Sequence, residues 1–230
     1  MISETGFITV SLLPGKTLPV SRIKIRHFVD EKKGYFACKR LFDIFISLLV
    51  IICILSWLAP VLAILIKSTS KGPVFFLQKR VGRGGKSFTC FKFRTMVLNN
   101  TAHLQQAAEN DERVTRIGRF LRHSNLDEFP QFFNVLFGSM SVVGPRPHMH
   151  ADCSRFSVMI PQYKFRNLVK PGITGLSQVK GYHGIIVSRE CITRRYQWDV
   201  FYIRNLNFSL DMKILFSTAA QRLKFFIAKS

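Results

Sequence analysis

The stretch IFISLLVIICILSWLAPVLAILI, residues 44–66, decides the fold of this chain. It carries no charged side chain and contains one proline, Pro60. Its 23 residues reach roughly 34 Å as a helix at about 1.5 Å per residue, and the hydrocarbon core of a bilayer is about 30 Å thick. Length and composition therefore predict a membrane helix.

Basic residues flank this run at both ends. Lys39 and Arg40 precede it, and Lys67 and Lys71 follow it. Because Lys and Arg favour the cytoplasmic side of a membrane, a helix that crosses the bilayer is expected to carry them mainly at one end. Here both ends favour the same side, and a simple span does not satisfy that preference.

Pro60 offers a second geometry. Its ring removes the N–H that would bond the carbonyl of Ser56, so we expect the helix to kink or break there. In lipid the freed carbonyl needs a partner, which the Ser56 hydroxyl or a neighbouring group can supply. A re-entrant helix would return both basic flanks to the cytoplasm, whereas a tilted span with a proline kink would separate them. The residues of the run leave both geometries open.

The net charge of the chain indicates which kinds of partner it can bind. The 230 residues contain 34 Lys and Arg against 13 Asp and Glu, for a net charge of +21. This balance favours polyanionic partners: nucleic acid, an anionic membrane surface or phosphorylated substrates. Because the chain also contains an apolar helix, we expect its partners to be anionic membrane lipids and phosphorylated substrates, and we expect no nucleic acid among them. The five scattered cysteines form no CxxC pair, which predicts free thiols in a reducing compartment.

The pattern divides the chain into four regions and predicts an α-rich α+β fold. They are a partly extended leader (1–37), the membrane helix (38–72), an interfacial globular domain (73–224) and a tail (225–230). Within the globular domain, β-like stretches at 74–78 and 87–94 flank a glycine turn and predict a small hairpin. We expect helices over 99–121, 129–137 and 209–226.

The first of these helices combines two stripes. Arginines recur every third residue beside an apolar face, with Arg113, Arg116, Arg119 and Arg122 in one stripe and Val114, Ile117, Phe120 and Leu121 in the other. A basic stripe is often a solvated face. Beside an apolar stripe it is typical of an amphipathic helix that lies on a membrane surface.

Acidic residues are few, so the adjacent pair Asp127 and Glu128 is notable. One interpretation is structural, because Ser124 and Asp127 have the spacing of a helix capping box. The other is chemical, because a carboxylate beside a phosphoryl group can attack phosphorus and form an acyl phosphate. That attack requires neutralisation by cations, and Asp127 or Glu128 would also suit Mg²⁺.

Basic side chains near this pair are candidates for phosphate binding. Arg122 lies just upstream, and Arg146 stands between Pro145 and Pro147 in a rigid loop. On the second β-like stretch, Lys92 and Arg94 can bind phosphate or face lipid headgroups, and the sequence does not separate these roles.

An ordered set of motifs covering about residues 38–223 resembles the bacterial sugar transferase family, whose members are monotopic phosphoglycosyl transferases. The motifs are KRLFD (39–43), KGPVFF (71–76), QKRVG (78–82), KFRTM (92–96), RIGRFLR (116–122), LDEFPQ (126–131), MSVVGPRP (140–147) and KPGITG (170–175).

The resemblance implies a two-step transfer. Asp127 would attack the β-phosphorus of a UDP-sugar and release UMP, and polyprenyl phosphate, such as undecaprenyl phosphate, would then accept the phosphosugar. Glu128 would assist Asp127 or help hold Mg²⁺, and Arg122 and Arg146 would bind phosphates. Pro145 and Pro147 would shape the nucleotide pocket.

The resemblance also implies a location for the chain in the cell. It implies a re-entrant helix on the cytosolic face of a bacterial inner membrane, in an enzyme that starts capsule, O-antigen, exopolysaccharide or glycan assembly. A homo-oligomer is compatible with the sequence. The alternatives are a membrane-tethered basic adaptor, a nucleic-acid-binding protein without catalysis, and a glycosyltransferase that releases UDP.

Overall fold

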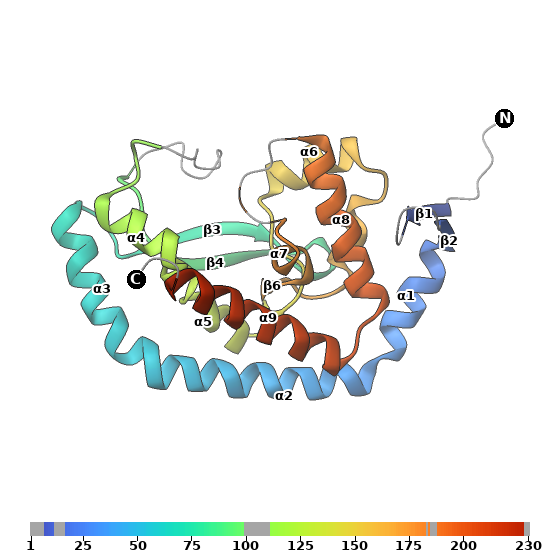
Figure 1. Cartoon of the computed structure of the whole chain (residues 1–230), viewed down its shortest axis with the longest axis horizontal. Coiled ribbons are helices and arrows are strands. Elements are labelled where there is room, and N and C mark those ends of the chain that lie inside the picture. The colour runs from blue at the N-terminus through green and yellow to red at the C-terminus, as the bar shows by residue number, and fades with distance from the viewer. Residues whose placement is uncertain (1–6, 12–16, 99–110, 183, 185–187, 228–230) are drawn as a thin grey trace.

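The computed structural model describes residues 7–11, 17–98, 111–182, 184 and 188–227. The strands are β1 (Phe7–Ser11), β2 (Thr17–Ser21), β3 (Phe75–Val81), β4 (Ser87–Phe93), β5 (Ser141–Val143) and β6 (Gly172–Thr174). The helices are α1 (Arg22–Glu31), α2 (Lys33–Val50), α3 (Ser56–Thr69), α4 (Arg116–Ser124), α5 (Gln131–Leu136), α6 (His150–Met159), α7 (Leu176–Val179), α8 (Arg189–Arg204) and α9 (Phe208–Ile227). Helices dominate, the β3–β4 hairpin and β6 lie in the centre, and β1 and β2 lie at the edge beside α1 (Figure 1).

The apolar run forms one long helical unit, Lys33–Thr69, which joins α2 to α3 through a π-helical segment, Ile51–Leu55. By length and composition this unit is sufficient to cross a membrane. Many of its large apolar side chains are exposed, for example Ile52 at 66% and Ile64 at 70%. A soluble protein rarely exposes so large an apolar surface without a partner, so the predicted contact with lipid fits the structure.

The helix is not interrupted at Pro60, which lies inside α3. It instead changes direction between α2 and α3, where the π-helical segment lies (Figure 1). A π-bulge disturbs the regular ladder of backbone hydrogen bonds and bends a helix. The Ser56 hydroxyl donates to the carbonyl of Ile52 at 2.6 Å, and the indole N–H of Trp57 donates to that of Cys53 at 2.9 Å. The Ser56 hydroxyl therefore binds a carbonyl one turn earlier, and of the two partners expected for the Ser56 carbonyl, its own hydroxyl is wrong.

Three polar side chains of α2 dock the long helix onto the globular domain. Asp43 is 2% exposed and accepts hydrogen bonds from the backbone N–H of Val142 at 2.9 Å and the hydroxyl of Ser141 at 3.1 Å. Arg40 donates to the carbonyls of Val135 and Leu136. The third, Lys39, pairs with a carboxylate of α9 at 2.7 Å.

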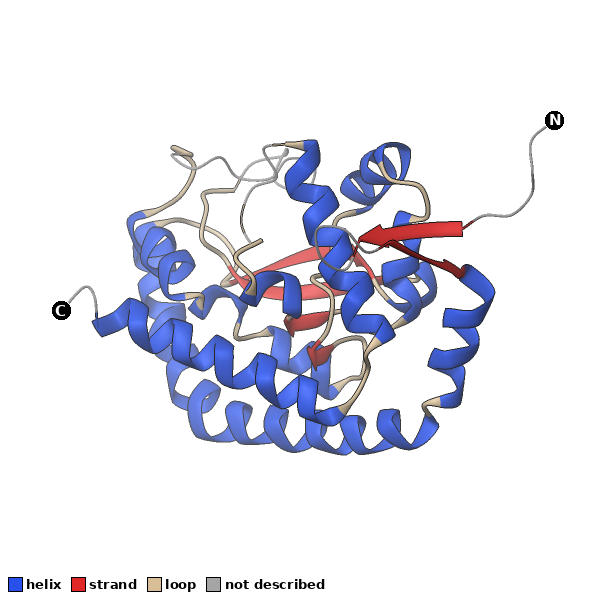
Figure 2. Cartoon of the chain, turned by 45° about the vertical axis from the view of Figure 1, so that its right-hand side comes forward, coloured by secondary structure: helices blue, strands red, loops and turns tan. Residues whose placement is uncertain are grey.

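The globular domain is built around two small sheets that helices enclose (Figure 2). Antiparallel β3 and β4 form the predicted hairpin, with Phe75 opposite Phe93 and Val81 opposite Ser87. Parallel β5 and β6 lie beside it. The main core includes side chains from α6, α8 and α9, and also Val29 of α1. Part of the leader (1–37) thus packs into the domain that follows it.

The amphipathic helix expected over 99–121 is only partly confirmed. Residues 99–110 lie outside the described part of the chain, and α4 begins at Arg116, with the Thr115 side chain capping it. Val114 pairs with Met96 in a β-bridge. Leu121 is fully buried against the apolar helix, while Phe120 is 57% exposed. Much of the apolar stripe that we expected to face lipid therefore packs against other parts of the protein.

The helices predicted over 129–137 and 209–226 correspond to α5 and α9. The five cysteines, all within the described residues, are free thiols, as predicted.

We predict that Asp43→Ala destabilises the protein by about 2–4 kcal/mol, because it leaves the buried N–H of Val142 without an acceptor. Asp43→Asn, which keeps one acceptor oxygen, is expected to cost less. The measurement is thermal unfolding in detergent micelles, with the exposed Asp30→Ala as the matched control. Equal unfolding temperatures for Asp43→Ala and Asp30→Ala would contradict the docking role of Asp43.

Candidate active site

A tight turn after α4 presents the acidic pair. Asn125 ends α4 in the left-handed conformation, with φ of 57°, and a 3-10 turn, Leu126–Glu128, follows. The Ser124 hydroxyl donates backward to the carbonyls of Phe120 and Leu121. The capping box predicted for Ser124 and Asp127 is therefore absent, because Ser124 ends one helix and Asp127 does not begin the next.

Glu128 is held between two cations. Its Oε1 lies 2.6 Å from Nζ of Lys92 and 2.6 Å from Nη2 of Arg146, and its Oε2 accepts from Nη1 of Arg146 at 3.2 Å. Burial alone would raise the pKa of Glu128, but Arg146 and Lys92 bring that pKa well below its usual range. Glu128 is therefore ionised and fixed in place.

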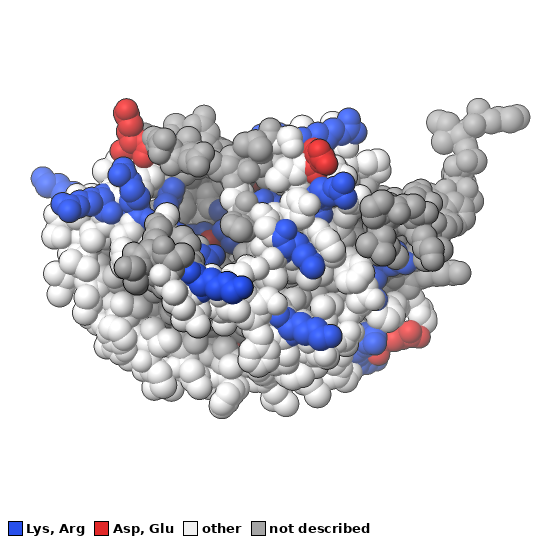
Figure 3. Space-filling view, viewed as in Figure 1, with Lys and Arg blue, Asp and Glu red and all other residues white. Residues whose placement is uncertain are grey.

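Asp127 is buried, at 8% exposed, but differs from its neighbour in having no hydrogen bond to any described residue. Burial raises the pKa of Asp127 to about 6, against the opposing effect of Lys92. The side chain lines a cavity of about 900 Å³, a volume within the range of small-molecule sites. On the space-filling surface, Lys and Arg side chains gather around a hollow (Figure 3). Asp127 is thus a carboxylate available to a ligand.

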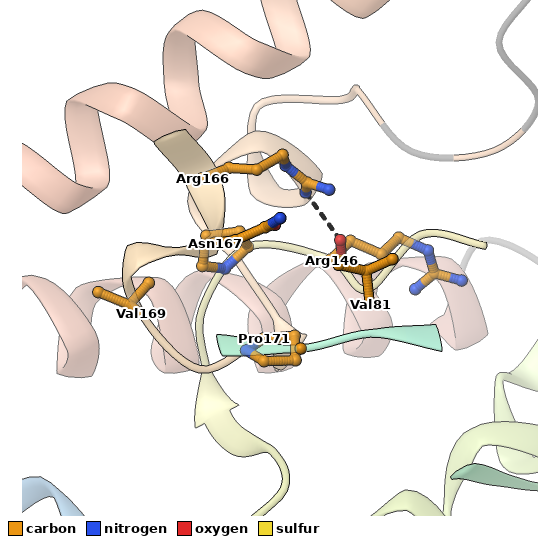
Figure 4. Close-up of a pocket in the computed structure, with 8 residues that line it drawn as sticks. Val81, Arg146, Arg166, Asn167, Val169 and Pro171 are labelled. Carbon is orange, nitrogen blue, oxygen red and sulfur yellow. Dashed lines mark hydrogen bonds between the residues drawn. The ribbon is translucent and has the colours of Figure 1, made fainter. Parts of the chain in front are cut away.

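The loop that carries Arg146 is anchored through its backbone. Nη2 of the buried Arg166 donates to the Arg146 carbonyl at 2.7 Å, while the side chain of Arg146 points away from this contact (Figure 4). On the flanks, Pro147 lines the large cavity, and Pro145 lines a separate small pocket beside Arg166. The proline-framed loop therefore fixes the backbone and directs the guanidinium toward Glu128.

Two other basic candidates have different surroundings. Arg122 lines the cavity, and its Nε donates to the Thr95 hydroxyl at 2.7 Å. Arg94 also borders the cavity, but its guanidinium donates to the carbonyls of Ser70 and Lys71 at the end of α3. Arg94 is engaged in joining the hairpin to the apolar helix, and Pro60 and Ser56 lie on that helix, outside the cavity lining.

The bacterial sugar transferase family model matches residues 34–225 of the chain. The chain belongs to the bacterial sugar transferase family.

Curated relatives agree with this family assignment. A UDP-glucose:undecaprenyl-phosphate glucose-1-phosphate transferase of Klebsiella pneumoniae is 48% identical over 225 residues, which are 96% of this chain and 48% of that protein. A UDP-N-acetylgalactosamine-undecaprenyl-phosphate N-acetylgalactosaminephosphotransferase of Aeromonas hydrophila is 40% identical over 86% of this chain and 48% of that protein. The exopolysaccharide production protein PSS of Rhizobium leguminosarum bv. phaseoli is 41% identical over 80% of this chain and 94% of that protein. The chain spans about half the length of the first two.

The acidic pair of this sugar transferase fits a divalent cation. Glu128 is largely taken up by Lys92 and Arg146, whereas the Asp127 carboxylate opens onto the cavity without a hydrogen bond to any described residue. Hard oxygen donors of this kind, completed by phosphate oxygens, suit Mg²⁺. Among the described residues, no group of three or more His, Cys, Asp or Glu side chains forms a closed metal site. An ion here would therefore share its ligands with substrate.

The sequence interpretation missed several residues that line the same cavity, among them Gln78, Arg80 and Arg195. The first two were detectable, because residues 78, 80 and 92 share one face of an antiparallel hairpin by their alternation and register. Arg195 lies in α8, far along the chain, and only the tertiary fold brings it near Arg146.

We predict that Asp127→Asn stabilises this sugar transferase at pH 8, by on the order of 2 kcal/mol. The folded protein holds the pKa of Asp127 near 6 and the unfolded chain near 3.8, so wild type loses stability as the pH rises between these values. Thermal unfolding from pH 4 to pH 8 measures the difference between the two proteins, which should be near zero at pH 4 and reach its maximum above pH 6.

Glu128→Gln is the matched control for this titration. It leaves Lys92 and Arg146 without their carboxylate and should destabilise the protein at pH 8. An Asp127→Asn variant less stable than wild type at pH 8 would contradict the assignment of Asp127 as a buried carboxylate without a partner.

Proposed function

We propose that the chain transfers a sugar 1-phosphate from a UDP-sugar to undecaprenyl phosphate. One observation carries the proposal: a buried carboxylate without a hydrogen bond to any described residue, Asp127, faces a cavity of about 900 Å³ lined by arginines. The names of the Klebsiella and Aeromonas relatives describe this reaction for glucose 1-phosphate and for an N-acetylgalactosamine phosphate. Their difference leaves the sugar of this chain to be measured.

The reaction proceeds in two balanced steps in this proposal. An Oδ of Asp127 forms a bond to the β-phosphorus of the UDP-sugar, and the bond from that phosphorus to the bridging oxygen breaks and releases UMP. An oxygen of the lipid phosphate then attacks the same phosphorus, and the Asp127 carboxylate leaves. The product is the lipid diphosphosugar, and Asp127 is regenerated.

The other residues of the site prepare Asp127 and bind phosphates. Arg146 and Lys92 hold the pKa of Glu128 low and keep that side chain ionised, while burial first and the charge of Glu128 second raise the pKa of Asp127. The charges of Lys92, Arg122 and Arg146 act on Asp127 from around the cavity, so they offset the repulsion between a carboxylate and a diphosphate. A bound Mg²⁺ would add neutralisation of phosphate charge, held by Asp127 or by Oε2 of Glu128.

The membrane geometry is part of the proposal. We infer that Lys33–Thr69 enters and leaves the cytosolic leaflet of the bacterial inner membrane, because its exposed face is apolar and basic residues lie at both ends. The change of direction between α2 and α3 supports a helix that returns to the side it entered (Figure 1). A lipid phosphate and a cytosolic nucleotide sugar would then meet at Asp127.

Two rival functions predict different products. A glycosyltransferase would move sugar without phosphate and release UDP, and a basic adaptor would release neither nucleotide. The cavity with Asp127 favours an enzyme over an adaptor, since an adaptor does not require a buried carboxylate that faces a ligand-sized space.

We predict that purified protein, incubated with Mg²⁺, undecaprenyl phosphate and a panel of UDP-sugars, releases UMP with at least one of them. Asp127→Asn should lower this turnover by about 10³-fold or more, because the amide is a poor nucleophile. Chromatography identifies the nucleotide, and intact-protein mass spectrometry without acceptor lipid tests for a phosphosugar bound to the wild-type chain.

Arg116→Gln, on the exposed face of α4, is the matched control and should keep near-normal turnover. Release of UDP in place of UMP would overturn the phosphosugar mechanism. Full activity of Asp127→Asn would remove Asp127 from it.

We predict that both ends of the apolar helix are labelled from the cytosolic side. The exposed native Cys38 marks one end and Lys71→Cys the other, each in a chain whose remaining cysteines are serine. A membrane-impermeant thiol reagent, applied to intact cells and to inside-out vesicles, should label both positions only in the vesicles. Labelling of one position from each side would establish a span and exclude the re-entrant helix.

A further inference from the structure

A second cluster of basic side chains lines the same cavity as the acidic pair and includes Arg80, His148 and Arg195. His148 is 4% exposed, and the charges that act on it most strongly are those of Arg166, Arg195, Arg80 and Arg146. Burial first, and these arginines second, hold the pKa of His148 well below its usual range, so the ring is neutral. Nδ1 of the ring bonds the Tyr163 hydroxyl at 2.6 Å, while Nε2 is buried without a hydrogen-bond partner.

Arg80 and Arg195 each donate hydrogen bonds to described residues, but each guanidinium keeps a donor without a partner. Arg80 bonds the Gln78 side chain and, at 3.2 Å, the carbonyl of Pro147. Arg195 donates from Nη2 to the carbonyl of Gly184 at 3.2 Å. The Nε atom of each guanidinium is buried without a hydrogen-bond partner. Both side chains, like His148, line the large cavity.

The charges of this cluster are not balanced within the described part of the chain. Arg166 has the buried Asp199 at 2.7 Å, and Arg146 has Glu128 at 2.6 Å. Neither Arg80 nor Arg195 forms an ion pair with any described residue, and the carboxylates that act on them, Glu128 and Asp152 on Arg80 and Asp199 on Arg195, do so without a direct contact. Burying a cation without a counter-charge is costly, and a bound anion removes that cost. The cluster therefore has the chemistry of an anion site.

We propose that Arg80, Arg195 and His148 form a subsite for the phosphate that stays on the nucleotide when the phosphosugar moves to Asp127. The inference rests on the proposed function and adds to it the group that holds the leaving UMP. Two guanidinium groups and a neutral imidazole match a phosphate monoester, which offers several acceptor oxygens.

Arg146 connects this subsite to the acidic pair. The main charges acting on Asp127 are those of Lys92, Glu128, Arg122 and Arg146. Arg195 is instead affected first by Arg146 among its charged neighbours. In an in-line displacement the attacking oxygen and the leaving oxygen lie on opposite sides of phosphorus. In the proposal, Asp127 attacks a phosphorus beside Arg146 from one side, and the subsite holds the phosphate that leaves on the opposite side.

The test compares binding of UMP and of uridine to the full chain in detergent micelles by titration calorimetry. Arg195→Gln should weaken UMP binding about tenfold or more, the loss expected for a charge-assisted hydrogen bond, and should leave uridine binding unchanged. The matched control, Arg194→Gln, removes the neighbouring arginine, whose side chain is 55% exposed, and should leave UMP binding unchanged.

A second variant guards against loss of the fold. Arg80→Gln acts from a different element, β3, and should also weaken UMP against uridine. The unfolding temperature of each variant is measured, and a variant that unfolds is replaced by its lysine counterpart, which keeps the charge and should still lose part of the affinity for UMP.

Three results would overturn the subsite. Unchanged UMP binding in the folded variants is the first, and an equal loss for UMP and uridine is the second. The third is a selective loss for a short-chain isoprenyl phosphate, which would assign these arginines to the acceptor. Because binding needs no turnover, failure of UMP release with intact Arg195-dependent UMP binding would remove the proposed reaction and keep the subsite.

Discussion

The buried contact between Asp43 and β5 is the constraint on which the arrangement of this protein depends. An apolar helix can pack against a domain in many rotations, because dispersion and hydrophobic contacts are not directional. A carboxylate that must accept from one backbone N–H and one hydroxyl selects a single rotation, since each residue turns a helix by about 100°. Arg40 adds direction, because it binds the carbonyls of Val135 and Leu136 at the end of α5.

This docking fixes the acidic pair through the hairpin. The far end of the apolar helix presents the carbonyls of Ser70 and Lys71, and Arg94 binds both. Lys92 lies two residues before Arg94, and its ammonium group forms an ion pair with Glu128. The long apolar helix, the hairpin and the acidic turn are therefore linked by side chains that are close in sequence, and the position of the helix fixes the position of the site.

Local features were predictable from the sequence, and long-range ones were not. The glycine turn marks the hairpin because tight turns need glycine, as Gly84 shows with φ of 68°. The prediction of a capping box was wrong because the same sequence is compatible with another local structure. In that structure Asn125 adopts the left-handed conformation and ends the helix before Asp127. Residues near 114 were predicted to be helical, but a bridge from Val114 to Met96 overrides that preference.

Residue type alone also failed to assign the arginines. Arg94, Arg146 and Arg195 look alike in the sequence, and their roles depend on which oxygen atoms the fold places beside them. For Arg94 these are carbonyls, and for Arg146 they are the Glu128 carboxylate. Arg195 has one carbonyl and an unused Nε. Arg94 and Arg195 each keep a buried Nε without a partner, but Arg94 binds two carbonyls and Arg195 only one, so Arg195 has the larger unused donor capacity.

The pKa values of the neighbouring carboxyl groups of Asp127 and Glu128 shift in opposite directions, because the nearby cations form hydrogen bonds with only one of them. Glu128 takes the hydrogen bonds of Lys92 and Arg146, so its negative charge is stabilised and the pKa of Glu128 falls. Asp127 receives the field of the same cations without their hydrogen bonds, so burial dominates and the pKa of Asp127 rises to about 6. A carboxylate stabilised by strong hydrogen bonds is a weak nucleophile, whereas a desolvated one is reactive once ionised. At neutral pH Asp127 is mostly ionised and has no hydrogen bond to any described residue, and the cations that Glu128 engages are what leave the Asp127 carboxylate available to a ligand.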